Sequence, residues 1–420
     1  MQREAAGTLP GPRARYLVIQ LARFGDLIQT KRLLVSLMAC GEVHLLVDRS
    51  LTALARLAFP GVRVHGISAH GTHGPAILGL VHDDLQELQA HQFHRIYNLN
   101  YSGLNFALAS LFPVDQVRGY RLAHGQRVVD AWPAQVMRWT KVRTTRGLNL
   151  VDVWGLYADQ PVEPERVNPA ASAGGIGLGV VMAGQNARRS VPPRVLAPLV
   201  HAASKRIGHG PILLLGAGAE RRAAAELRAA LPGSLRGAVR DLVGKTSWAD
   251  LFEVVGGLGL LLSPDTGTMH LAAHLGVPVM AFFLSSAWCH ETGPYGTGHL
   301  VLQAMATCAP CLETGSCPNG VLCRNVFSEP GLLRYVSGQD VAQFPPHVAA
   351  MASTVDSLGV CFRPDAGIDP FMEERQSFRA AVARIAGIPG PAPCSVPLDE
   401  SWIQERDWML PQTLRGRANE

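Results

Sequence analysis

The sequence is poor in charged residues. Only 17% of its 420 residues are Asp, Glu, Lys or Arg, and the formal net charge is +5. So small an excess of positive charge does not favour a nucleic-acid-binding protein, although it is compatible with an anionic small substrate. Global disorder is excluded as well, because 47% of the residues are hydrophobic.

Long hydrophobic runs are missing. The two most apolar stretches, residues 254–263 and 277–286, are shorter than the roughly 18 to 20 residues that span a bilayer, and Asp265 lies between them. We interpret both as buried strands. Residues 1–15 mix charged residues with Gly and Pro and lack the apolar core of a secretory signal. We therefore expect a cytoplasmic protein.

A complete dinucleotide-binding fingerprint is absent. The segment GAGAE at residues 216–220 starts like one, but Arg221 stands where the third glycine is required. NAD binding is therefore not predicted, and we interpret Glu220 as the start of a helix.

The length predicts two domains, because single cores rarely exceed about 250 to 300 residues. Short apolar strands alternate with helical segments over residues 16–111 and again over 179–283, as in parallel α/β sheets. We predict a leader, two Rossmann-like domains, a Cys-rich segment and a Pro-rich C-terminal extension with one helix over 372–385. The predicted bounds are 1–15, 16–169, 175–300, 305–328 and 329–420.

A candidate anion site lies where a buried strand meets a helix, in the segment SPDTGTMH at residues 263–270. The first turn of a helix offers unpaired N–H groups and the positive end of the helix dipole, which favour a diphosphate. Gly267 permits close approach, Thr266 and Thr268 can donate to phosphate oxygens, and Asp265 can accept from sugar hydroxyls. An ordinary capped helix explains the local pattern equally well.

Four motifs occur in a fixed order along the chain. They are GD at residues 25–26, GKTS at 244–247, the segment DTGTMHLAAHLGVP at 265–278, and TGPYG at 292–296. Together they resemble glycosyltransferase family 9, the bacterial lipopolysaccharide heptosyltransferases, over residues 16–296. The resemblance implies a GT-B fold, with two Rossmann-like domains facing across a cleft. It also implies inverting transfer of a sugar from a nucleotide diphosphate donor, typically ADP-heptose.

The resemblance also implies roles for single residues. Asp26 matches the catalytic base, and a carboxylate there could take the proton of an attacking hydroxyl. The alternative is an N-cap of a helix that begins at Leu27. Acceptor contacts are predicted for Gly25, Asn98 and Asn100, although relatives often show Asp-x-Gln at the latter two positions. The predicted donor-binding residues are Gln185, Asn186, Arg188, Arg189, Lys245, Asp265, Thr266, Gly267, Thr268 and His270.

Positive charge is needed beside the diphosphate, because negative charge develops there as the glycosidic bond breaks. Relatives commonly show Lys-Arg-Trp-Pro near this point, whereas this chain has RRSVPPR at residues 188–194. Alignment on the proline pair places Arg189 at the lysine position. Arginine can still clamp a phosphate, with a geometry that differs from lysine. The alternative is a solvated pair, Arg188 and Arg189.

The most asymmetric charge lies between residues 118 and 146. Seven Lys and Arg residues there are opposed only by Asp130, with Trp132 and Trp139 among them. In the first domain, this segment could hold an anionic glycolipid or touch an acidic membrane surface. The alternative is a solvated basic face with core tryptophans.

Four cysteines, Cys308, Cys311, Cys317 and Cys323, lie close together in the sequence. Four thiolates at short spacing suit a structural zinc or iron ion, and no catalytic metal is expected. In a protein-glycosylating branch of the resembled family, a similar segment binds iron. The alternatives are free thiols, or disulfides formed after cell lysis.

The sequence thus predicts a glycosyltransferase that moves a heptose or a related sugar from an ADP-sugar to a lipopolysaccharide core. No nucleic-acid partner is expected, and peripheral contact with the inner face of the inner membrane is compatible with this function. One alternative keeps the chemistry and changes the acceptor to a protein or another glycan. A second is a nonenzymatic, metal-containing scaffold.

Overall fold

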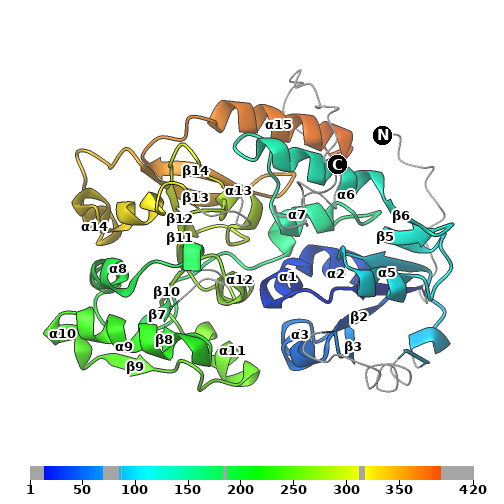
Figure 1. The fold of residues 1–420 in the computed structure, drawn as a ribbon, viewed down its shortest axis with the longest axis horizontal. Helices are drawn as coiled ribbons and strands as arrows, with labels where there is room; N and C mark the ends of the chain where they lie inside the picture. The colour runs from blue at the N-terminus through cyan, green and yellow to red at the C-terminus, as the bar shows by residue number, and fades with distance from the viewer. Residues whose placement is uncertain (1–13, 70–84, 87, 183–186, 312–316, 389–420) are drawn as a thin grey trace. The chain divides into compact units, whose positions relative to one another are not determined.

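The computed structural model describes residues 14–69, 85–86, 88–182, 187–311 and 317–388, and the chain divides into two compact units (Figure 1). The first unit contains the chain up to Met137 together with residues 151–162. The second contains residues 138–150 and the chain from Glu163 onward. Residues 138–150 therefore pack with the second unit, although the predicted boundary placed them in the first.

The first unit is built on a six-stranded sheet with the order β3-β2-β1-β4-β5-β6. Its strands pair in parallel, except that β5 and β6 form an antiparallel hairpin. The strands are β1 (Arg15–Ile19), β2 (Glu42–Asp48), β3 (Arg63–Ile67), β4 (Arg95–Asn98), β5 (Val117–Ala123) and β6 (Gln126–Val129). Strand β1 lies between β2 and β4, so the strand order reverses beside it.

Helices flank this sheet, and apolar residues such as Leu17 and Ile96 are fully buried in its core. A buried ion pair fixes residues 151–162 to the unit: Arg32 Nη1 donates to Asp152 Oδ1 at 2.6 Å, and Arg32 Nε donates to the Val162 carbonyl at 3.1 Å. The described helices are α1 (Phe24–Gln29), α2 (Lys31–Met38), α3 (Thr52–Ala58), α5 (Gly103–Ala109), α6 (Ala131–Trp139) and α7 (Leu150–Gly155).

The second unit has an eight-stranded sheet with the order β14-β13-β12-β11-β10-β7-β8-β9. The strands from β7 to β12 pair in parallel, and β13 and β14 extend the sheet in antiparallel fashion. The strands are β7 (Leu178–Val181), β8 (Ile212–Leu215), β9 (Val239–Asp241), β10 (Leu260–Ser263), β11 (Val279–Phe283), β12 (Leu300–Ala304), β13 (Val348–Val355) and β14 (Val360–Ala366). Here the strand order reverses between β7 and β10.

The segment predicted as a C-terminal extension contributes to the second core. Its strand β13 pairs with β12, with Leu300 opposite Ala352, and the helix predicted over 372–385 is confirmed as α15 (Met372–Ile385). The other α-helices of this unit are α8 (Pro193–Arg206), α9 (Arg221–Ala230), α10 (Gly233–Arg236), α11 (Trp248–Gly256), α12 (Gly267–His274), α13 (Cys289–Thr292) and α14 (Pro330–Val336).

Two α/β units dominated by parallel strands confirm the predicted fold class of two Rossmann-like domains. Among the helices within the described ranges, none is long and apolar enough to cross a membrane.

Candidate active site

Each unit has a point where the strand order reverses, and ligands of open α/β sheets bind beside such points at the carboxyl ends of the strands. In the first unit this point lies between β1 and β4, and in the second between β7 and β10. Asp26 follows β1 and Asn100 follows β4. Arg189 follows β7 and Asp265 follows β10. The sequence-predicted residues on these loops therefore flank the two reversal points.

Asp26 lies in the first turn of α1, which begins at Phe24, and its side chain is partly exposed. The N-cap position belongs to Arg23, so the alternative of Asp26 as an N-cap is wrong. A carboxylate in a first turn is stabilised by the helix dipole. The preceding residue, Gly25, accepts a hydrogen bond from Gln29 Nε2 at 3.2 Å through its carbonyl.

Asn100 ties the end of β4 to the loop after β1. Its Oδ1 accepts hydrogen bonds from the backbone N–H groups of Leu21, at 2.7 Å, and Ala22, at 3.2 Å. That loop leads into the helix that carries Asp26. Asn100 is therefore placed to position the loop of the predicted base.

Asn98 is fully buried and engaged inside the first unit. Its Nδ2 donates to the carbonyls of Tyr120, at 2.7 Å, and Asn105, at 3.2 Å, while its Oδ1 accepts from Asn105 Nδ2 at 2.9 Å. These contacts join β4 to β5 and α5. They support a structural role for Asn98 in place of the acceptor contact predicted from the sequence.

Asp265 is the centre of a buried polar group in the second unit. Arg189 Nη2 donates to its carboxylate and, at 3.2 Å, to its carbonyl, and Thr292 Oγ1 donates to Asp265 Oδ2 at 2.8 Å. His270 Nε2 lies 3.6 Å from Asp265 Oδ1. Burial opposes ionisation of this carboxyl, but Arg189, His270 and Thr292 hold its pKa below the usual value. We call these four residues the Asp265 group.

Helix α12 begins directly after Asp265. Thr266 is its N-cap, and Thr266 Oγ1 accepts from the Met269 N–H at 3.4 Å and lies 3.0 Å from Ser263 Oγ. The capping interpretation of Thr266 is thus confirmed. Gly267 and Thr268 form the first turn, where backbone N–H groups have no partner within the helix.

The remaining predicted donor residues lie apart. Arg188 Nη2 donates to Cys311 Sγ at 3.1 Å, towards the Cys-rich segment. The exposed Lys245 Nζ donates to the Asp241 carbonyl at 2.7 Å within its own loop. Gln185 and Asn186 are outside the described residues.

An ion pair that the sequence did not predict joins Arg143 to Glu291. Arg143 Nε lies 2.9 Å from both carboxylate oxygens, and its Nη2 donates to the Ser286 carbonyl at 2.8 Å. Although burial opposes the charge, Glu291 raises the pKa of Arg143, so the guanidinium stays charged. Glu291 directly precedes TGPYG, the one sequence signal that pointed here.

The basic segment 118–146 is divided between the units, because Arg138 and the residues up to 150 belong to the second. Its placement in the first domain was therefore correct only for its first part. There Arg121 pairs with Asp130, while Arg127 is exposed. Trp132 and Trp139 are buried, as the alternative of core tryptophans predicted.

Within the described residues, Cys308, Cys311, Cys317 and Cys323 form no disulfide. Burial raises the pKa of Cys323, and charge on the other three thiols raises it further. Cys311 Sγ contacts Ser285 Oγ at 3.2 Å, and Cys317 Sγ accepts from the Val321 N–H at 3.3 Å. Their sulfur atoms do not form a metal-binding group as close as the histidine group described below.

Two Rossmann-like units, each with polar residues at the point where its strand order reverses, agree with the fold expected from the sequence. The model of glycosyltransferase family 9 (heptosyltransferase) matches residues 201–321. For this segment, which lies in the second unit, the resemblance seen in the sequence is confirmed. No curated protein matches the chain.

Solved structures agree in fold. E. coli ADP-heptose lps heptosyltransferase II matches with a TM-score of 0.53 and 17% identity, over 70% of this chain and 91% of that chain. A family 9 glycosyl transferase from Veillonella parvula matches with a TM-score of 0.53 and 14% identity, over 76% and 97%. E. coli heptosyltransferase WaaC with ADP matches with a TM-score of 0.50 and 16% identity, over 69% and 93%.

Proposed function

We propose that this chain is a glycosyltransferase that transfers a heptose or a related sugar from an ADP-linked donor to the core of lipopolysaccharide, with inversion. The Asp265 group at the reversal point of the second unit is the observation that carries the proposal. The fold-level likeness to E. coli heptosyltransferase WaaC with ADP supports the choice of nucleotide. Contact with the inner face of the membrane would bring the enzyme to a lipid-linked acceptor.

The donor diphosphate would bind at the start of α12. The first-turn N–H groups at Gly267 and Thr268 and the helix dipole favour an anion there. Arg189, held by Asp265, would supply the positive charge that stabilises the leaving diphosphate as the glycosidic bond breaks. A guanidinium carries five N–H donors and can bind a carboxylate and a phosphate at the same time. His270 and Thr292 would keep Asp265 in place.

Asp26 would act as the general base. An inverting transfer needs a group that removes the acceptor proton while the hydroxyl attacks the anomeric carbon, and a partly exposed carboxylate can do so. Asn100 would position the loop of Asp26 through its two backbone hydrogen bonds. The exposed Arg127 on the β5–β6 hairpin would attract an anionic glycolipid.

Replacement of Asp26 tests the proposed base. Asp26→Asn keeps the shape and removes the basic oxygen, so we expect kcat to fall by about 10² to 10⁴ with nearly unchanged ADP affinity. The exposed Asp115→Asn of the same unit is the matched control. Full transfer by a folded Asp26→Asn variant would refute the assignment.

Calorimetry with ADP and UDP, followed by mass measurement of products from a panel of nucleotide sugars, tests donor and acceptor. A heptose increment on a lipopolysaccharide core supports the proposal. A mass increment on a protein would show that the acceptor is a protein in place of lipopolysaccharide. Absence of binding to either nucleotide would favour the nonenzymatic scaffold.

The four clustered cysteines would hold a structural zinc or iron ion. Four thiolates match the tetrahedral preference of these ions, and burial together with charge on the other three thiols raises the pKa of Cys323. The ion would stabilise the segment that contains these cysteines. Metal analysis of the purified chain and of a Cys308→Ser, Cys311→Ser variant tests this assignment.

A further inference from the structure

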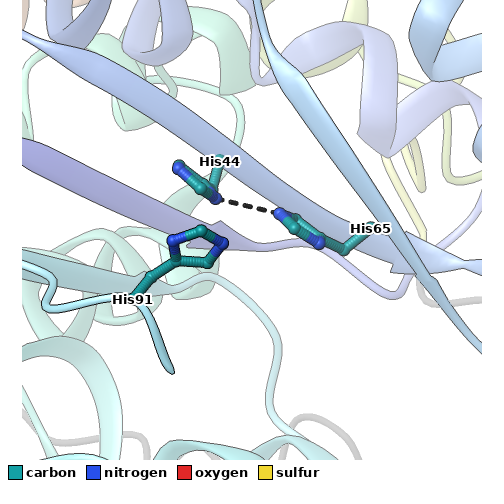
Figure 2. A group of neighbouring side chains, drawn as sticks. All are labelled: His44, His65 and His91. Atoms are coloured by element: carbon teal, nitrogen blue, oxygen red, sulfur yellow. Dashed lines mark hydrogen bonds between the residues drawn. The ribbon is translucent and has the colours of Figure 1, made fainter. Parts of the chain in front are cut away.

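Three histidines from separate segments of the first unit meet at one place. His44 lies on β2, His65 lies on β3, and His91 lies in the segment before β4 (Figure 2). In the parallel register, Leu46 is opposite His65, so His44 and His65 are diagonal neighbours. Proposed donor-binding and base residues include none of these side chains.

The three rings are close enough to share one ion. One ligand nitrogen from each ring lies within 4.8 Å of the others, and His44 Nδ1 is 2.9 Å from His65 Nε2 (Figure 2). The centroid of the His91 ring is 4.5 Å from that of His44. A single ion bound by two or three imidazoles requires such a grouping of nitrogens.

The surroundings of the three rings limit which polar partners their ring nitrogens can have. His44 is fully buried, while His65 and His91 are half-buried. Each histidine stands two positions before a residue of one buried apolar cluster. These residues are Leu46, Ile67 and Phe93, in the same order. Imidazole nitrogens above an apolar core need polar partners, and water reaches only the outer part of the group.

A carboxylate stands behind the buried ring. While Nδ1 of His44 faces His65, its Nε2 lies 3.5 Å from Glu42 Oε1. Metal-binding histidines usually direct their second nitrogen to a carboxylate or carbonyl, which fixes the ring and raises its basicity. Arg15 and Arg63 hold Glu42 in turn. A mere stack of aromatic rings would not require this arrangement.

We propose that His44, His65 and His91 bind a divalent transition ion, with Zn²⁺ as the best-matched species, and that Glu42 positions the ring of His44. Three neutral imidazoles leave a fourth tetrahedral position for water or another small ligand. His44 and His65 are the third residues of their strands, away from the carboxyl ends where Asp26 lies. The ion would therefore join β2, β3 and the segment before β4, outside the transfer chemistry.

The experiment must separate this site from the four cysteines. The full chain carrying Cys308→Ser and Cys311→Ser is loaded with Zn²⁺, freed of excess ion and assayed for bound metal. We expect one ion per chain in this background. His91→Gln and His65→Gln should each weaken Zn²⁺ binding at least about tenfold, whereas the exposed His94→Gln, from the same segment as His91, should not.

A second measurement covers variants that fold poorly. Thermal unfolding is followed with chelator and with Zn²⁺, because an ion that binds only the folded state raises the unfolding temperature. Zn²⁺ should raise the unfolding temperature of the His94→Gln control and should not raise that of His91→Gln. With chelator, we expect the two variants to unfold at the same temperature. Glu42→Gln should weaken the site by about 10 to 100-fold. No zinc in the Cys308→Ser, Cys311→Ser background, or full zinc retention by His91→Gln, would overturn the proposal.

Discussion

The pair formed by Arg189 and Asp265 gives the sharpest test of the proposed donor site. Its side chains are only 16% and 7% exposed. Asp265→Ala would leave the guanidinium buried without its carboxylate, which costs about 3 to 5 kcal/mol of folding free energy. The same change removes the acceptor of the Thr292 hydroxyl. We expect a correspondingly lower denaturation midpoint in urea.

A double-mutant cycle separates the pair from its surroundings. Replacement of both charges, as in Arg189→Met with Asp265→Leu, removes the unpaired charge and restores apolar contact, so much of the loss should be recovered. Urea unfolding of the wild type, both single variants and the double variant measures this coupling. If the double variant loses as much as the two single variants together, the residues are not coupled and our account of Asp265 is refuted.

Nucleotide binding provides the functional half of the same test. If Arg189 contacts the diphosphate, Arg189→Met should weaken ADP binding by about 10 to 100-fold and leave adenosine binding nearly unchanged, because only ADP carries the phosphates. Calorimetry with both ligands measures the two effects. An equal loss for ADP and adenosine would mean that Arg189 only supports the fold.

Two further predictions concern positioning and pH. Asn100→Ala removes two hydrogen bonds to the loop of Asp26, so kcat should fall by about 10 to 100-fold with little change in the KM for the donor; Asn100→Asp, which keeps an acceptor oxygen, should recover most of the rate, and a failure to do so would contradict the positioning role. Burial lowers the pKa of His299 from 6.5 to about 4, so the unfolded chain takes up a proton first as the pH falls. The contribution of His299 to the free energy of unfolding should therefore be fully present above pH 6.5 and should fall by about 3 kcal/mol towards pH 4. His299→Gln should flatten this part of the urea-unfolding profile, and an unchanged slope would exclude His299 as its source.

Central strands of both sheets could be predicted from the sequence, because strands buried on both faces are continuous apolar runs. Residues 212–215 and 260–263 are of this kind and match β8 and β10. Strands β3, β13 and β14 could not. β3 contains Gly66 between polar and apolar residues, β13 is rich in small residues, and β14 contains Pro364, which an edge strand tolerates.

The site could be predicted in part. The ordered motifs pointed to Asp265 and His270, which the structure brings together. They did not show that Arg189 binds Asp265, because the two residues are 76 positions apart and no local spacing encodes that contact. The histidines were missed for the same reason: only the register of β2 and β3 brings His44 near His65.

The TGPYG motif shows how packing and chemistry act on the same residues. Thr292 ends α13 and binds Asp265, and Gly293 follows at once. A Cβ on Gly293 would lie 2.5 Å from the Cys289 carbonyl and would also meet the Phe362 ring. Any side chain there would displace the end of α13, and with it the Thr292 hydroxyl. Gly293 is therefore required because no space for a side chain exists beside the Asp265 group, and its absence of a side chain preserves the hydrogen bond from Thr292 to Asp265.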